Sequence, residues 1–252
     1  MIKISVIIIV KNEEKMLPGC LETVSWADEV LVVDTGSIDK TVEIAREFGA
    51  KVVSYGKGGN FSAWRSKGLK EAKGEWLFYI DADERVTDQL QKEVRSIILA
   101  GDINFSVYAV PRLNVILGKE MRHGGWWPDY VERLFRKKTL ISWHGELHER
   151  PEYKGNLGYL KNYLIHNKHE TISEMVEKTN TWSQVEAKLM YQANHPKMNI
   201  LRFSSAMFRE FWMRMIIKQA FLDGAEGVIF AIYQVYSRFI SYVKLWEMQL
   251  KS

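Results

Sequence analysis

The stretch EWLFYIDADERV, residues 75–86, joins two features that decide the fold. Residues 76–80 are apolar and predict a buried strand, and the strand runs directly into Asp81-Ala82-Asp83-Glu84. Three carboxylates in four positions repel one another and cannot be buried unpaired. The sequence therefore predicts a cation, or a cationic partner, at the end of this strand.

Length and composition fit a folded α/β protein. The chain has 252 residues, of which 46% are hydrophobic and 26% charged, and this composition excludes a disordered chain. The net charge of +4 is only mildly basic. This net charge fits a phosphate-bearing or membrane-surface partner, but it fits an ordinary solvent-exposed surface equally well. We expect no nucleic-acid partner. A single cysteine, Cys20, excludes an internal disulfide, so we expect a reducing, cytoplasmic location.

The order of patterns along the chain predicts two regions. Apolar runs at residues 3–10, 29–33, 51–55 and 76–80 alternate with helical stretches, which indicates a mostly parallel sheet with helices on both faces. Residues 102–165 read as a small antiparallel extension, and the pattern is helical from about residue 170. We therefore predict a catalytic domain at 1–168 and a C-terminal helical region at 169–252. No segment has the length of a clean transmembrane helix.

The ends of the apolar runs carry the candidate ligands. Asp34 and Asp81 both follow predicted strands, and ligands of parallel sheets bind beyond the carboxyl ends of strands. Each aspartate could instead only cap its own turn, an alternative that is stronger for Asp34. Oxygen ligands at this place suit Mg²⁺ or Mn²⁺ rather than zinc. Because alternate residues of an extended chain point to opposite sides, Asp81 and Asp83 need not share one ligand. The Glu84-Arg85 pair could be only a salt bridge at the start of a helix.

Four motifs together resemble a known family. They are SVIIIVKNEE (5–14), VLVVDTGSIDKT (30–41), FSAWRSKGLKEAKGEWLFYIDADE (61–84) and RLFRK (133–137). In order and spacing they resemble the family 2 glycosyltransferases of the GT-A fold, over roughly residues 3–150. The resemblance implies transfer of a sugar from a nucleotide-sugar, by default a UDP-hexose, to an acceptor. It also implies inversion at the sugar carbon and use of a divalent cation.

The resemblance also implies roles for individual residues. It places the nucleotide-sugar on Val10, Lys11, Glu13, Asp34, Arg65, Asp81, Ala82 and Asp83. In this set Asp34 reads the base, Arg65 lies near the diphosphate, and Asp83 is the main metal ligand. The loop after the first strand lacks the family's proline and tyrosine, and Ser66 replaces an asparagine. A nucleoside diphosphate carries negative charge, so Arg65 and the cation would stabilise the departing nucleotide.

An inverting transfer also needs a base that takes the proton of the acceptor hydroxyl. Glu149 lies in ISWHGELHERP (141–151), and its His-Glu pair resembles one found in lipopolysaccharide-core-type members. We predict Glu149 as the catalytic base, with Glu146 and Asp129 as rivals. These acids could instead only pair with nearby arginines. By resemblance His166 is a further metal ligand, although a lone histidine is often just hydrogen-bonded.

The remaining expectations concern the acceptor and the C-terminal region. Trp126, Trp127 and Arg133 are predicted to bind the acceptor, because indole faces suit sugars and arginine suits phosphate; plain packing is the alternative. In the last helix Gln234, Ser237, Arg238, Ser241 and Lys244 form one polar stripe beside a broad apolar face. This pattern suits a helix at a membrane surface, or helices packed on the catalytic domain or in a homodimer.

The predicted function is therefore a metal-dependent glycosyltransferase for a lipid-linked or cell-envelope glycan, on the inner face of the cytoplasmic membrane. The alternatives are a nucleotide-sugar-binding scaffold without turnover and a nucleotide-sugar pyrophosphorylase. A pyrophosphorylase would need a glycine-rich loop after the first strand, and residues 10–14 contain no glycine. An NAD enzyme would need G-x-G-x-x-G there, which is also missing.

Overall fold

The computed structural model describes residues 3–56, 58–101, 104–145 and 149–251. The contacts within the chain divide it into two compact units. The sheet unit comprises residues 1–112 and 129–166, and the helical unit comprises residues 113–128 and 167–252. The division into domains at residue 168 remains a prediction.

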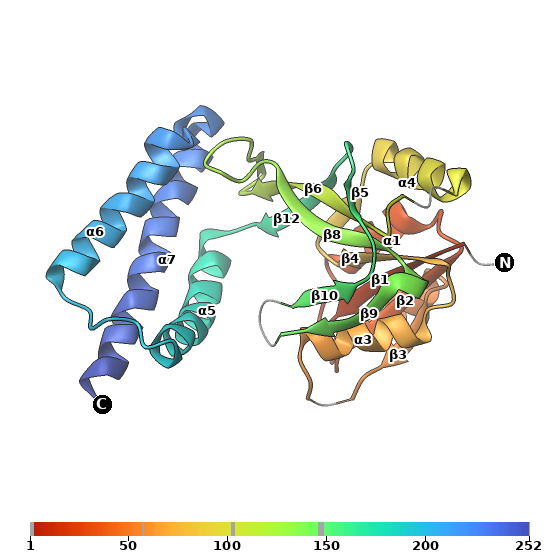
Figure 1. The fold of residues 1–252 in the computed structure, drawn as a ribbon, viewed down its shortest axis with the longest axis horizontal. Coiled ribbons are helices and arrows are strands. Elements are labelled where there is room, and N and C mark those ends of the chain that lie inside the picture. Colours follow the sequence, from red (N-terminus) through yellow and green to blue (C-terminus); the bar gives the residue numbers. More distant parts are fainter. Residues whose placement is uncertain (1–2, 57, 102–103, 146–148, 252) are drawn as a thin grey trace. The chain divides into compact units, whose positions relative to one another are not determined.

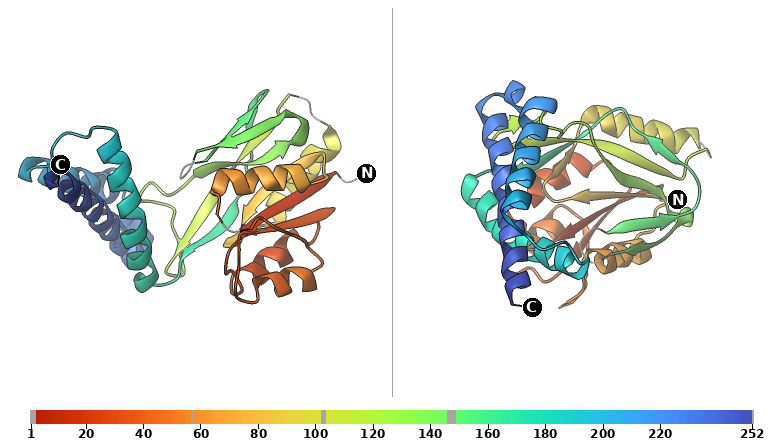
Figure 2. Two further views of the ribbon diagram at one scale, coloured as in Figure 1. Left: turned by 90° about the horizontal axis from the view of Figure 1, so that it is seen from below. Right: turned by 60° about the vertical axis from the view of Figure 1, so that its left-hand side comes forward.

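A mixed sheet forms the sheet unit (Figures 1 and 2). Its parallel half has the order β3 (Lys51–Ser54), β2 (Glu29–Asp34), β1 (Ile4–Val10) and β4 (Trp76–Asp81). It continues into β8 (Asp129–Arg136), β6 (Val107–Ile116), β12 (Leu164–His169) and β5 (Glu84–Val86), and the pairs β4–β8, β8–β6 and β12–β5 are antiparallel. The short β7 (Lys119–Glu120) and β11 (Leu157–Tyr159) pair with β6, and β9 (Leu140–His144) and β10 (Arg150–Tyr153) form a separate hairpin. The predicted parallel sheet with an antiparallel extension is confirmed.

Both faces of the parallel half are covered, as the continuous apolar strands predict. On one face α1 (Leu17–Val24), α2 (Thr41–Glu47) and α4 (Asp88–Ala100) pack on alternate residues of β1 and β4. On the other face α3 (Phe61–Glu71) and the β9–β10 hairpin cover the remaining residues of these strands. A one-turn 3₁₀ helix, η1 (Lys137–Thr139), leads into the hairpin.

The strand register brings the predicted strand-end aspartates to one edge. Val10 of β1 lies opposite Asp34 of β2, and Ile9 of β1 lies opposite Asp81 of β4. Neighbouring strands are about 4.8 Å apart, so the backbones of the two aspartates are about 10 Å apart across β1. The prediction that both residues end parallel strands is therefore confirmed.

The chain after the acidic cluster differs from one prediction. Residues 84–86 form β5 rather than the start of a helix, and α4 begins later, at Asp88, where the Thr87 side chain caps it. The interpretation of Glu84-Arg85 as a helix-start salt bridge is therefore wrong. The Arg85 guanidinium instead donates to the carbonyl oxygens of Met16 and Ala82, each at 2.8 Å.

The helical unit consists of α5 (Ile172–Gln192), α6 (Ile200–Phe211) and α7 (Gly224–Leu250), with a π-helical turn η2 (Trp212–Ile217) and a 3₁₀ turn η3 (Ala220–Asp223) between the last two. The predicted helical region is thus confirmed. Part of the polar stripe on α7 faces α5. Ser241 donates to Glu186 at 2.7 Å, and the Lys244 ammonium donates to the Asn180 side chain at 2.9 Å. Within the described residues, no helix is both long enough and apolar enough to cross a bilayer.

The buried thiol of Cys20 gives a first test of this fold. Cys20 lies in α1 with no exposed surface, and burial raises the pKa of its thiol above the ordinary value. We expect the native protein to resist iodoacetamide at pH 8, because the thiolate is the reactive form, and to react fully in denaturant. Mass spectrometry of the two samples measures this difference. Rapid alkylation of the native protein would show that α1 does not pack as described.

Candidate nucleotide-sugar and cation site

The loops after β1 and β2 are joined at the carboxyl edge of the sheet. The Asn12 backbone amide donates to Ser37 Oγ at 2.9 Å, and the Asn12 side chain accepts from the amide of Ile38 at 2.8 Å. The Glu13 amide donates to Thr41 Oγ1 at 2.7 Å. These contacts bring together the predicted base-binding residues that follow the two strands.

Within this edge Val10 is buried and Lys11 is exposed. Asp34 accepts hydrogen bonds from the amides of Gly36 at 3.3 Å and Ser37 at 3.0 Å, so it caps its own turn, as the alternative predicted. Its role in reading a nucleotide base stays a prediction.

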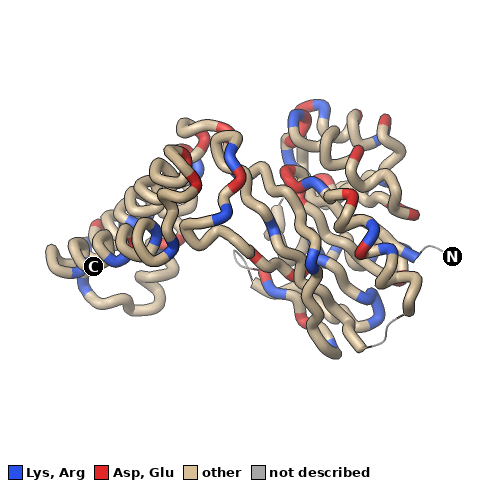
Figure 3. Tube along the Cα trace, turned by 90° about the horizontal axis from the view of Figure 1, so that it is seen from above, with Lys and Arg blue, Asp and Glu red and all other residues tan. Residues whose placement is uncertain are grey.

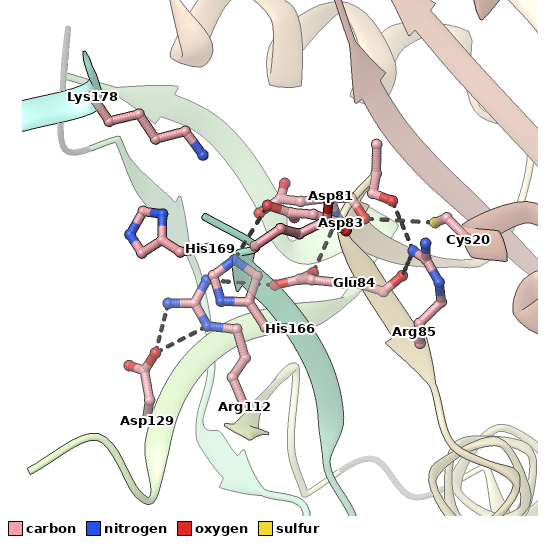
Figure 4. A network of polar contacts seen from close by, with 12 residues as sticks. Cys20, Asp81, Asp83, Glu84, Arg85, Arg112, Asp129, His166, His169 and Lys178 are labelled. Carbon is pink, nitrogen blue, oxygen red and sulfur yellow. Dashed lines mark hydrogen bonds and ion pairs between the residues drawn. The ribbon is translucent and has the colours of Figure 1, made fainter. Parts of the chain in front are cut away.

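Glu84 organises the acidic turn between β4 and β5, and it is fully buried. One of its carboxylate oxygens accepts from the backbone amide of Asp81 at 3.0 Å. The other lies 2.6 Å from Nη2 of Arg133 and 3.4 Å from Nη1 of Arg112. A buried carboxylate needs such partners, because an unpaired charge could not be desolvated. Glu84 therefore ties the turn to β8 and β6. Figure 4 shows Glu84 beside Arg112 of β6.

Asp81 shares the arginine of Glu84. Its carboxylate bonds to Arg133 and lies 3.4 Å from Arg65. Burial by itself would raise the pKa of Asp81, but the positive charges of Arg133 and Arg65 outweigh it and hold this pKa well below its usual range. Burial by itself would lower the pKa of Arg133, whereas the two carboxylates raise it. Asp81 and Arg133 therefore both stay ionised at neutral pH.

Asp83 has a different environment from Asp81. Its Oδ2 lies 3.4 Å from Nε2 of His166, a residue of β12. The pairing of β12 with β5 places His166 directly opposite Glu84, so the sheet itself brings the histidine to the acidic turn. Ala82, between the two aspartates, is buried. The two residues predicted to hold a cation are thus neighbours, and Figure 4 shows them together.

Asp83 and His166 fit a magnesium or manganese ion that is completed by other ligands. In the described part of the chain no group of three or more His, Cys, Asp or Glu side chains could hold a metal. A carboxylate and an imidazole are compatible with Mn²⁺, and Mg²⁺ commonly takes one or two protein ligands together with water and substrate phosphates. The donor set therefore matches a cation that binds together with a diphosphate.

Arg65 links the acidic turn to the predicted base. It lies in α3, is 5% exposed, and its guanidinium lies over the ring of Trp143 at 4.9 Å. Its backbone carbonyl accepts from the hydroxyl of Tyr79 at 3.0 Å. Its Nε lies 3.0 Å from a carboxylate oxygen of Glu149. The structure thus places Arg65 between Asp81 and Glu149.

A cavity of about 950 Å³ opens beside this cluster. Its lining includes Arg65, Asp81, Arg112, Arg133, Trp143 and Glu149. The predicted base and the predicted diphosphate arginine therefore face one space, which is large enough for a sugar. Arg133 also lines this space, but its guanidinium already binds two carboxylates, and its predicted contact with an acceptor stays a prediction.

The rival base Asp129 has other surroundings than Glu149. Asp129 forms a bidentate pair with Arg112, at 3.0 and 2.7 Å, which matches the alternative that these acids only pair with arginines. Glu146 lies outside the described residues. Of the two rivals, the structure describes only Asp129, and this residue pairs with Arg112 rather than with Arg65.

The predicted acceptor tryptophans belong to the helical unit. The ring of Trp126 lies 4.8 Å from that of Phe230, and the Arg214 guanidinium lies 4.3 Å above it. Trp127 has the guanidinium of Arg122 at 5.7 Å. The contacts of Trp126 are those of a packed residue, and the acceptor role of both tryptophans stays a prediction.

Sequence reasoning missed two residues of the site, Arg112 and Trp143. Their partners are far away in the chain, so no local pattern indicates them. Glu84 belongs to the acidic cluster for which the sequence predicts a cation or a cationic partner, because a third carboxylate beside a buried strand needs its own cation. Arg133 and Arg112 are the cationic partners that the structure places beside it.

Comparison with known proteins agrees with this geometry. The family model described as Glycosyl transferase family 2 matches residues 5–155. An uncharacterized glycosyltransferase of Rickettsia typhi is 28% identical over 261 residues, covering 99% of this chain and 89% of the relative. Glycosyltransferase SunS of Bacillus subtilis is 29% identical over 199 residues, covering 75% of this chain and 46% of the relative.

Two solved structures have a similar fold. The crystal structure of S. aureus TarS 1–349 with UDP-GlcNAc has a TM-score of 0.50 at 16% identity, covering 99% of this chain and 92% of that chain. Glucosyl-3-phosphoglycerate synthase from Mycobacterium tuberculosis, in complex with Mn²⁺, UDP and phosphoglyceric acid, has a TM-score of 0.50 at 17% identity, covering 78% of this chain and 80% of that chain.

These findings define the class of protein as a glycosyltransferase with the GT-A fold. The chain belongs to glycosyl transferase family 2. The predicted family and fold are confirmed, and the lipopolysaccharide-core subtype remains a prediction.

Replacing Arg133 by methionine tests the buried ion cluster. Arg133→Met leaves Glu84 with one arginine at 3.4 Å, and removal of one partner of a buried pair costs about 3 kcal/mol of unfolding free energy at pH 7. The folded pKa of Asp81 lies below its unfolded value of about 3.9, so its share of the stabilisation is complete above that pH and is lost as the pH falls through the folded pKa.

We therefore expect the difference between parent and Arg133→Met to shrink below about pH 4 in urea titrations followed by circular dichroism. Arg150→Met, at an exposed position beside the same cavity, is the matched control and should change stability by less than about 0.5 kcal/mol. Equal stability of the parent and Arg133→Met at pH 7 would contradict the described cluster.

Proposed function

We propose that this glycosyltransferase is inverting and metal-dependent, and that it moves a hexose from UDP to a lipid-linked or cell-envelope glycan. One observation carries the proposal: the carboxylates of the acidic turn, residues 81–84, have two different kinds of partner. Asp81 and Glu84 bind arginines, whereas Asp83 lies beside His166 at the edge where parallel sheets bind ligands.

The donor side follows from the charges at this edge. Asp83 and His166 would hold Mg²⁺ or Mn²⁺, which supplies charge stabilisation to the departing nucleotide diphosphate. Arg65 offers a planar guanidinium that can form paired hydrogen bonds with phosphate oxygens. Its cation–π contact with Trp143 and its two carboxylate neighbours hold it in place before the donor binds.

The acceptor side uses Glu149. Its carboxylate faces the cavity and takes the proton from the acceptor hydroxyl, while that oxygen forms a bond to C1 of the sugar. The bond from C1 to the nucleotide oxygen breaks on the opposite face, and the nucleotide leaves with the bonding electrons. One carboxylate therefore suffices for a single displacement with inversion.

The proposal of a UDP-sugar donor is based on the two solved structures of similar fold. The TarS structure contains UDP-GlcNAc, and the mycobacterial synthase structure contains UDP and Mn²⁺. A related fold supports the same type of donor and cation here, while the sugar and the acceptor depend on side chains that differ between the proteins. We place the reaction on the inner face of the cytoplasmic membrane, since the buried free thiol of Cys20 suits a reducing compartment.

Asp83→Asn tests the cation site. The amide lacks the charge that a divalent ion needs, so Mn²⁺-dependent UDP binding should weaken at least about tenfold in isothermal titration calorimetry. Asp88→Asn, an exposed aspartate in the first turn of α4, is the matched control and should bind UDP like the parent. An unchanged manganese dependence in Asp83→Asn would exclude Asp83 as a ligand.

Glu149→Gln tests the base and separates an enzyme from a silent scaffold. The amide cannot take the proton, so turnover should fall by about 10² or more while UDP affinity stays within about threefold of the parent. The assay is UDP release from UDP-sugars with Mn²⁺ and an extract that contains lipid-linked glycans. Glu75→Gln, exposed and outside the cavity, is the control. Turnover of Glu149→Gln at the parent rate would place the base elsewhere, and UDP binding without any turnover in the parent would favour the scaffold.

A further inference from the structure

The segment from α6 to η3 exposes many large apolar side chains. Ten of them within residues 200–222 are between 40% and 78% exposed: Ile200, Leu201, Phe208, Phe211, Trp212, Met213, Ile216, Ile217, Phe221 and Leu222. We call this set the apolar face. Contiguous exposed apolar surface of this extent marks an interaction site in a soluble chain.

On α6 the apolar face occupies one side of the helix. At about 100° per residue, Ile200, Leu201, Phe208, Phe211 and Trp212 fall within an arc of roughly 120°. Ala206, on another side of the helix, is buried, and α6 packs there on α7. The apolar face is therefore turned away from the core of its own unit.

Basic residues border this arc. Arg202 and Arg209 are seven residues apart, which places them together on one edge of α6, and both are exposed. Lys197 precedes α6 and Lys218 follows η2, and both are also exposed. None of these four side chains has an ion pair with another described residue. Figure 3 shows where the charged positions fall along the trace.

Acidic residues do not balance this charge. Two acids lie between residues 196 and 224. Glu210 is paired with Arg214 at 3.0 Å and lies 4.0 Å from Arg238, and Asp223 is buried and accepts from the backbone amide of His123 at 2.7 Å. Since Glu210 and Arg214 compensate each other, the segment keeps four exposed positive charges from Lys197, Arg202, Arg209 and Lys218. The partner of the apolar face must therefore be apolar in part and negatively charged.

A second copy of this chain does not meet that requirement. The exposed stripe Ile229, Ile232, Tyr236, Phe239, Trp246 and Leu250 on α7 follows spacings of three, four and seven, which can pair helices. In a two-fold dimer that buries the apolar face of α6, however, this face meets the same face of the second copy. The four uncompensated bases of the α6 region would then face the same four bases, and like charges disfavour that contact.

We propose that the apolar face docks the protein on an anionic lipid bilayer. Amphipathic helices with aromatic residues on one side and Arg or Lys beside them bind in the headgroup region without crossing the membrane. Phe208, Phe211 and Trp212 would enter the boundary between headgroups and acyl chains. Arg202 and Arg209 would bind lipid phosphates while their aliphatic stems cover apolar surface.

The test is sedimentation of the full chain with lipid vesicles. We expect affinity for vesicles of phosphatidylglycerol and phosphatidylcholine to exceed that for phosphatidylcholine alone by about tenfold or more, and to fall as salt rises. The double variant Arg202→Glu/Arg209→Glu should lose about tenfold or more of the anionic binding. Phe208→Ser/Trp212→Ser should lose binding to a similar extent.

Two matched controls change the same properties elsewhere. Lys70→Glu/Lys92→Glu reverses two exposed charges of the sheet unit, and Ile38→Ser/Leu99→Ser removes two of its exposed apolar side chains. Both should bind vesicles like the parent. The salt dependence is measured on the parent protein. It therefore tests the proposal even if a variant misfolds.

The proposal is overturned if the parent binds both vesicle types equally, or binds neither. It is also overturned if Arg202→Glu/Arg209→Glu binds anionic vesicles like the parent. A concentration-dependent dimer in analytical ultracentrifugation that these variants break, without vesicle binding, would identify a second copy as the occupant. Docking uses no residue of the cation site, so Asp83→Asn should still bind vesicles, and the outcome is independent of the proposed reaction.

Discussion

The fully buried carboxylate of Glu84 is the constraint on which the site depends. It accepts from the amide of Asp81 and pairs with Arg133 and Arg112, so that it joins the end of β4 to β8 and β6. A charge at this depth is tolerated only with its partners in place. The three contacts fix the path of the acidic turn at the junction between the parallel and antiparallel halves of the sheet.

That fixed path gives the neighbouring carboxylates different tasks. Asp81 is drawn toward Arg133 and Arg65, whereas Asp83 lies beside His166. Arg65 in turn lies against Glu149, so the proposed donor and acceptor sides meet at one guanidinium. A diphosphate that binds Arg65 would therefore change the contact between Arg65 and Glu149, the proposed base.

Local patterns in the sequence could predict the parallel half of the sheet and the place of its ligands. The apolar runs set the strands, and Asp34 and Asp81 follow from where those runs end. The contacts of Glu84 could not be predicted, because Arg133 is 49 residues away and only the folded sheet brings the two together. For the same reason the sequence of the last helix leaves the surroundings of Ser241 open, because its partner Glu186 lies 55 residues away in α5.

The most direct measurement is a crystal structure of the chain with UDP and Mn²⁺, with anomalous data collected for manganese. The account predicts a manganese peak bonded to a carboxylate oxygen of Asp83 and to the diphosphate, with Arg133 still bound to Asp81 and Glu84. A peak on Asp81 with Arg133 displaced, or a manganese ion remote from Asp83, would contradict the division of the acidic turn.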